Sequence, residues 1–181
     1  MTQRNESLPL WRPLKVDEIK ETVSGTIEAT VPEMAAVAEL LDLSGLEGLA
    51  MTYRLSRIGA GRFRLNGEIK AKVTQTCVVS LDPVQSVIAA PVEAEFWPED
   101  TIAAHAAHEE DQGSVTLADW PEPISEGLID LGVILYETLA TSLDPYPRKE
   151  GVNFEWSERE AEPGGERATS PFAALEALKR R

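Results

Sequence analysis

The sequence has no lysine or arginine between Val73 and Pro147, although the same stretch holds 14 acidic residues. Basic and acidic residues balance on both sides of it, so this stretch carries the whole net charge of −14. Affinity for nucleic acid comes mainly from lysine and arginine at phosphates, which argues against a large RNA-binding surface in this stretch. Its charge favours cationic partners instead.

Cysteine and histidine are also scarce, with Cys77 as the one thiol. A single cysteine forms no internal disulfide, which fits a reducing compartment. Ser80 stands where a CxxC pair would have its second cysteine, so a zinc site of that kind is excluded. Because free cysteine is usually buried, we predict a packing role for Cys77. With no phosphate-binding loop or nucleotide fingerprint, we expect no cofactor.

No run of about 18 apolar residues is present, as a membrane helix would need. The first residues lack the basic start and apolar core of a signal peptide, so we expect a cytoplasmic protein. The length of 181 residues suits one domain with a core, which we place at 8–150. We predict a disordered polar linker over 151–170 and a short docking helix over 171–181. The apolar residues of that helix are Phe172, Leu175 and Leu178.

Alternating apolar and polar residues predict strands in the first hundred residues. The clearest case is a β-hairpin over Leu49–Val79 that turns at Gly59–Gly61. Val23–Ala29 and Val84–Trp97 alternate in the same way, and Pro91 indicates an edge or a bulge. We therefore predict an α+β fold, with a curled antiparallel sheet or partial barrel and two main helices.

The two helices are expected at Pro32–Leu41 and Leu128–Leu143. Proline in the first turn and an apolar stripe support the first. Asp130 is a suitable N-cap for the second. Pro145 and Pro147 forbid its continuation.

Residues 98–123 are predicted to form an acidic, alanine-rich and disordered excursion from the domain. His105 and His108 lie three residues apart within it, beside several carboxylates. On a helix both imidazoles would share one face and hold a metal, as in a metal-dependent hydrolase or nuclease. The other interpretation is a solvated loop with two incidental histidines.

The most basic stretch lies within the predicted hairpin and includes a single acid, Glu68. Arg64, Lys70 and Lys72 share strand parity and therefore one face of the hairpin. This face suits RNA phosphate or an acidic protein surface, although lysine and arginine also protect sheet edges from unwanted pairing. The six basic residues are Arg54, Arg57, Arg62, Arg64, Lys70 and Lys72.

Three segments resemble the YceD family of large ribosomal RNA subunit accumulation proteins, in its alphaproteobacterial branch. They read TCVVSLDPV, IDLGVILYETLATSLDPYPRK and, near the end, PFAALEALK. The resemblance covers about 8–151 plus the tail motif. In many relatives the first cysteine begins a CxxC-like pair, from which Ser80 departs here. The resemblance implies that the positions of a family signature are Cys77, Asp130, Leu131, Glu137, Pro145 and Pro147.

The resemblance implies a non-catalytic factor needed for normal levels of 23S ribosomal RNA, and hence for large-subunit assembly. We expect the acidic stretch to hold a basic large-subunit ribosomal protein or an assembly intermediate, and the basic hairpin to contact pre-23S rRNA or another factor. The enzyme with a metal at His105 and His108 is the alternative. A third possibility is a scaffold that acts only through residues 171–181.

Overall fold

The computed structural model describes residues 8–103 and 120–153. This part of the chain is α+β, as the sequence predicts. In chain order its elements are β1 (Pro13–Lys15), the 3-10 helix η1 (Val16–Glu18), β2 (Thr22–Glu28), α1 (Val31–Leu40), β3 (Gly45–Gly59), β4 (Arg62–Thr76), β5 (Pro83–Pro98), β6 (Glu122–Ile124), β7 (Leu128–Asp130) and α3 (Leu131–Ser142).

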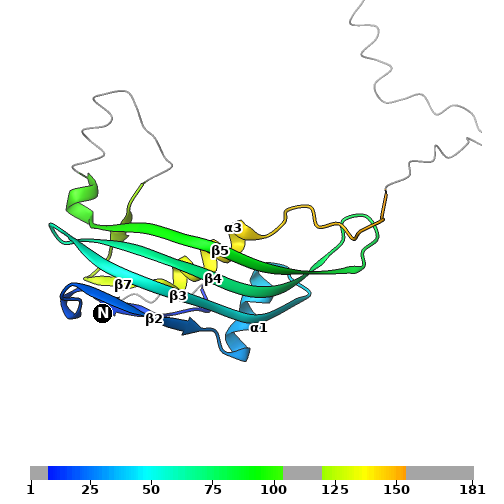
Figure 1. Ribbon diagram of the computed structural model, residues 1–181, viewed down its shortest axis with the longest axis horizontal. Coiled ribbons are helices and arrows are strands. Elements are labelled where there is room, and N and C mark those ends of the chain that lie inside the picture. Colours follow the sequence, from blue (N-terminus) through cyan, green and yellow to red (C-terminus); the bar gives the residue numbers. More distant parts are fainter. Residues whose placement is uncertain (1–7, 104–119, 154–181) are drawn as a thin grey trace, which may run out of the picture.

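A curved sheet of five strands forms the body of the protein, in the order β2-β3-β4-β5-β6. All neighbours are antiparallel except β5 and β6, which pair in parallel over three residues. The sheet curls without closing, so β2 lies at one edge and β5 with the short β6 at the other (Figure 1). The predicted curled sheet is therefore confirmed. A separate two-stranded sheet joins β1 to β7.

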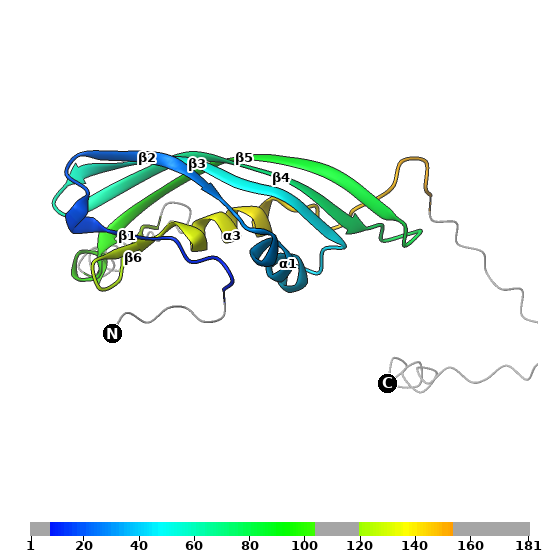
Figure 2. The same ribbon diagram turned by 90° about the horizontal axis from the view of Figure 1, so that it is seen from below.

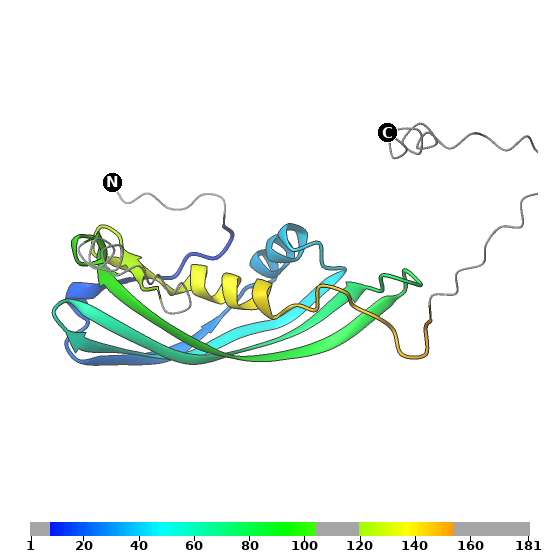
Figure 3. The ribbon, with the colours of Figure 1, turned by 90° about the horizontal axis from the view of Figure 1, so that it is seen from above.

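Both helices pack on the concave side of the sheet, and the convex side faces away from them (Figures 2 and 3). The alternation along β4 explains this arrangement, because Phe63, Leu65 and Ile69 are buried while the residues between them are at most partly so. Leu135 and Leu139 of α3 complete the core from the helical side. Truncating one of these leucines to alanine typically costs about 2–5 kcal/mol.

The start of α3 is fixed by the side chain of Asp130, as predicted. Its Oδ1 accepts hydrogen bonds from the amide nitrogens of Gly132 at 2.9 Å and Arg12 at 2.8 Å. Glycine is required at position 132, since a Cβ there would lie 2.7 Å from the carbonyl oxygen of Leu10. The helix begins at Leu131 rather than at Leu128, because Leu128–Asp130 pair with β1 as strand β7.

The other helix, α1, carries a capping box between Thr30 and Glu33. Glu33 also receives the guanidinium of Arg12 at 2.8 Å through both of its oxygens. This pair holds the pKa of Glu33 down at about 2, chiefly through the hydrogen bonds from Arg12. Arg12 therefore links the start of α1 to the start of α3.

Both ends of the predicted disordered excursion are structured instead, because Pro98 ends β5 and Glu122 and Pro123 belong to β6. Its histidines, His105 and His108, lie outside the described residues. So do nearly all of the predicted linker and the whole tail segment with Phe172, Leu175 and Leu178. Within the described ranges, no helix has the length and apolar character needed to cross a membrane.

Candidate functional site

Most of the basic residues of the β3–β4 hairpin lie on the convex face of the sheet. Arg64, Lys70 and Lys72 alternate with buried residues and lie on the convex face, as their parity predicts, and the register places Arg54 opposite Asn66 on the same face. Arg57 differs, because its guanidinium lies 5.2 Å from the ring centre of buried Phe63.

Carboxylates offset much of the positive charge on the convex face. Arg64 pairs with Glu95 at 2.7 Å, and Lys70 pairs with Glu68 at 2.9 Å. Arg62 stacks over the ring of Trp97 at 4.9 Å. The convex face is therefore a mixed surface and not a continuous basic stripe. Of the six basic residues, Arg54 and Lys72 alone have no ion pair or ring contact with the described part of the chain.

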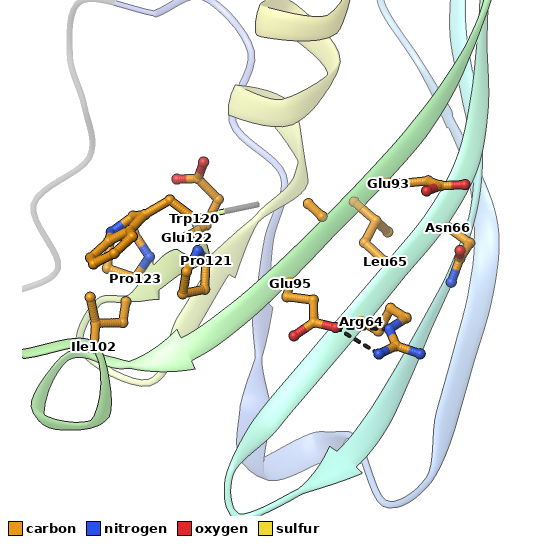
Figure 4. Close-up of a pocket in the computed structure, with 11 residues that line it drawn as sticks. Arg64, Leu65, Asn66, Glu93, Glu95, Ile102, Trp120, Pro121, Glu122 and Pro123 are labelled. Atoms are coloured by element: carbon orange, nitrogen blue, oxygen red, sulfur yellow. Dashed lines mark hydrogen bonds and ion pairs between the residues drawn. The ribbon is translucent and has the colours of Figure 1, made fainter. Parts of the chain in front are cut away.

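A pocket of about 790 Å³ opens where β5 approaches β6 (Figure 4). Three carboxylates line it against one guanidinium, that of Arg64, which already pairs with Glu95. The wall opposite β5 combines Ile102 with Trp120 and the strand that follows it. We call this the acidic pocket, and its main lining residues are Arg64, Asn66, Glu93, Glu95, Ile102, Trp120, Pro121, Glu122 and Pro123.

The carboxylates around the acidic pocket are in different electrostatic states. Hydrogen bonds from Arg64 and Trp97 lower the pKa of Glu95. On α3, partial burial and the nearby carboxylate of Glu122 raise the pKa of Glu137. Within the described residues, Glu93, Glu122 and Glu137 have no ion pair. This end of the sheet therefore holds negative charge that a cationic partner would stabilise.

Strands β4 and β5 form a second hairpin, and its turn, at the end away from the acidic pocket, is built around Cys77, which is fully buried. The backbone amides of Ser80 and Lys149 each lie 3.4 Å from its Sγ. Hydrogen bonds from Ser80, and then from the backbone of Lys149 and Val79, lower the pKa of Cys77 to about 6. The thiol therefore joins two segments that lie 72 residues apart, namely the two that the sequence singles out.

Further bonds fasten these two segments together. The Nζ of Lys149 lies 2.9 Å from Asp82, and the amide of Val78 donates to the carbonyl oxygen of Pro147 at 2.9 Å. Leu81 adopts a φ of 62°, which non-glycine residues rarely adopt. We call the turn over residues 77–82, together with the segment 145–149 that is bonded to it, the hairpin tip. Apolar side chains nevertheless remain exposed there. They are Val78, Leu81 and Tyr146.

The residues of the predicted signature occupy three different environments. Cys77 and Pro147 are buried at the hairpin tip, where Pro145 is exposed. Leu131 is in the core, and Asp130 caps α3. Glu137 lies near the acidic pocket. Among residues 8–103 and 120–153, no three histidine, cysteine or acidic side chains come together as a metal site would require.

Sequence reasoning missed the acidic pocket, although it singled out the acidic stretch that supplies most of its walls. Trp120 and Glu122 come to Glu93 and Glu95 through the parallel pairing of β6 with β5. A strand of three residues has no periodicity from which to predict that pairing. The absence of basic residues over 73–147 was the one available signal.

Comparison with known protein families matches residues 65–179 to the family described as large ribosomal RNA subunit accumulation protein YceD. No curated protein and no solved structure matches the chain. The matched range includes both segments of the hairpin tip, the strands β5 and β6 beside the acidic pocket, and α3. Because it spans more than half of the 181 residues, the chain belongs to the YceD family.

Proposed function

We propose that this protein is a non-catalytic factor that supports the accumulation of 23S ribosomal RNA and the assembly of the large ribosomal subunit. Membership of a family named for that accumulation is the observation that carries the proposal. The place of action of such a factor is the cytoplasm, where bacterial ribosomes assemble.

The contact that we favour is with a basic large-subunit ribosomal protein, through the acidic pocket. A protein that binds ribosomal RNA needs lysine and arginine for its phosphates, and before assembly those side chains lack anionic partners. Glu93 and Glu122 line the pocket and offer such partners, since no described cation pairs with them. Complementary charge accelerates the encounter and selects the partner.

Direct contact with pre-23S rRNA through the convex face has weaker support. Phosphate binding needs cations that are not already neutralised, and Arg64 and Lys70 are both paired with glutamates. The metal-dependent enzyme has no supporting observation, because His105 and His108 lie outside the described residues.

Purification of the tagged full-length protein from its own cells at low salt, with and without RNase, tests the proposal. We expect a large-subunit protein to remain bound after RNase treatment and to leave as salt is raised. The double variant with Glu93→Lys and Glu122→Lys, purified in the same way, should retain less of that large-subunit protein. Loss of every ribosomal component after RNase would contradict the protein contact and favour RNA. Unchanged 23S rRNA levels in cells lacking the protein would contradict the function itself.

A further inference from the structure

Among the described residues, the edge of the sheet formed by β5 is unpaired over most of its length. β4 pairs with β5 from Pro83 to Phe96, whereas β6 reaches the other side of β5 only from Phe96 onwards. Within the described residues, no other segment forms a backbone hydrogen bond with residues 84–95. Figure 1 shows β5 at the margin of the sheet. An uncovered edge of this kind presents unpaired amide and carbonyl groups that can pair with another strand.

The usual protection against such pairing is incomplete here. No charged residue occurs from Pro83 to Val92, and the side chain of Val87 is 74% exposed. Prolines stand at positions 83 and 91, which leaves seven residues between them with amide hydrogens. Seven residues are enough for a strand of ordinary length.

The positions of these prolines indicate which amides face outwards. In an antiparallel pair, each residue turns its amide and carbonyl alternately to one neighbouring strand and then to the other. Prolines within a strand are found where the nitrogen faces the open edge, since they have no hydrogen to donate. Pro83 and Pro91 share odd parity, and this parity assigns the amides of Gln85, Val87 and Ala89 to the open edge.

This edge leads directly into the acidic pocket. Glu93 and Glu95 continue β5 beyond Pro91, and Glu122 of β6, which has already joined the same edge, lines the same pocket. An added strand that ran along residues 84–90 would therefore bring its end to the carboxylates. Its side chains would meet uncharged residues first and negative charge afterwards.

We propose that the open edge of β5 accepts an extended, lysine- and arginine-bearing segment of a partner protein as an additional strand, whose basic side chains lie in the acidic pocket. Backbone hydrogen bonds supply affinity in this mode of recognition, and side-chain pockets supply specificity. The choice of a basic protein segment rests on the proposed function, whereas the pairing itself rests on the edge.

The direct test uses a fluorescent peptide in which lysine and valine alternate. It has about seven residues, which is a typical strand length. Its matched control carries methyl groups on two adjacent central backbone nitrogens, which block both edges of the peptide and leave its charge unchanged. We expect the full-length protein to bind the first peptide about tenfold more tightly in fluorescence anisotropy, equivalent to roughly 1.4 kcal/mol. Equal affinity for both peptides, or no binding at low salt, would overturn strand addition.

A protein variant tests the same edge from the other side. Ala89→Pro removes an outward amide at a position of the same parity as Pro91, and Ala89→Thr keeps that amide as the control. We expect about a tenfold loss of peptide affinity for the proline variant alone, with both variants keeping the wild-type melting temperature. Equal affinities of the two folded variants would contradict the proposal. If the proline variant does not fold, the methylated peptide still decides.

The two proposals fail in distinguishable ways. A protein that binds the alternating peptide but retains no ribosomal component from cells contradicts the proposed function and leaves strand addition intact. A protein that retains a large-subunit protein after RNase, with equal retention by Ala89→Pro and Ala89→Thr, contradicts strand addition and leaves the function intact.

Discussion

The two ends of the β4–β5 hairpin differ in how their polar groups are used. At the hairpin tip, Cys77, Asp82 and Lys149 satisfy one another across segments that are distant in the sequence. At the acidic pocket, Glu93 and Glu122 have no ion pair within the described residues. Polar groups at the tip therefore stabilise the fold, whereas the carboxylates of Glu93 and Glu122 at the pocket are available to a partner. Variants at each end should separate binding from stability.

The largest effect that we predict is on binding, at the acidic pocket. The double substitution Glu93→Lys and Glu122→Lys reverses two charges that have no ion pair within the described residues. It should weaken binding of the ribosomal protein about tenfold to a hundredfold. Titration at fixed low salt measures this loss. The melting temperature should stay near the wild-type value, because neither carboxylate has an ion pair within the described residues to lose.

The charge-neutral double variant with Glu93→Gln and Glu122→Gln serves as the control and should give a smaller loss. Equal losses for the two double variants would indicate that hydrogen bonding, and not charge, holds the partner. A large fall in melting temperature would show that this end also stabilises the fold.

The second effect is on stability, at the hairpin tip. Cys77→Ala removes a buried sulfur and leaves the amides of Ser80 and Lys149 without their acceptor, which should cost about 1–3 kcal/mol of unfolding free energy. Urea denaturation measures it. Partner binding by the folded variant should be unchanged. Val78→Ala, at an exposed side chain of the same turn, is the control and should cost much less.

A third prediction sharpens the comparison by separating carboxylates that look alike in the sequence. Asp130 caps α3 and also binds the amide of Arg12, so Asp130→Ala should cost about 1–2 kcal/mol of stability. Asp130→Asn keeps an acceptor oxygen and should cost less. Thermal unfolding of both variants measures the difference. If both were as stable as the wild type, the cap would contribute nothing.

The smallest effect is a pH dependence at the tip. The pKa of Cys77 is lowered in the folded protein to about 6, from an ordinary value of 9.0. A group whose pKa is lowered by folding stabilises the folded protein fully above its pKa in the unfolded chain. This stabilisation is lost as the pH falls through its pKa in the folded protein. The stability difference between wild type and Cys77→Ser should therefore grow from pH 6 to pH 9. Absorbance of the thiolate at low ultraviolet wavelengths follows the titration, and an ordinary thiol midpoint would refute the assignment.

The sequence predicted those parts of the fold that depend on local chemistry. Alternation located the long hairpin, and the capping aspartate located the start of α3. Pro91 indicated an edge or a bulge, and of these the described residues show an edge at that point of β5. These features depend on neighbours within a few residues, which the sequence displays directly.

The sequence did not predict the contacts that make the candidate sites. Strands β6 and β7 have three residues each, too few for a periodic pattern. The bond between Lys149 and Cys77 joins segments whose spacing in the chain says nothing about their distance in space. Strand parity placed Arg64, Lys70 and Lys72 on one face, but the pairing of Arg64 with Glu95 depends on the choice of neighbouring strand and on register.

The pairing of β1 with β7 has a consequence for synthesis. The amide of Arg12 binds Asp130 although 118 residues separate them, so β1 lacks its partner strand until β7 has been translated. Contacts of such long range slow folding, because the loop between them must be ordered first. The hairpin is made earlier, and Arg64 leaves the ribosome 31 residues before Glu95. A nascent chain therefore presents Arg64 before the carboxylate that pairs with it.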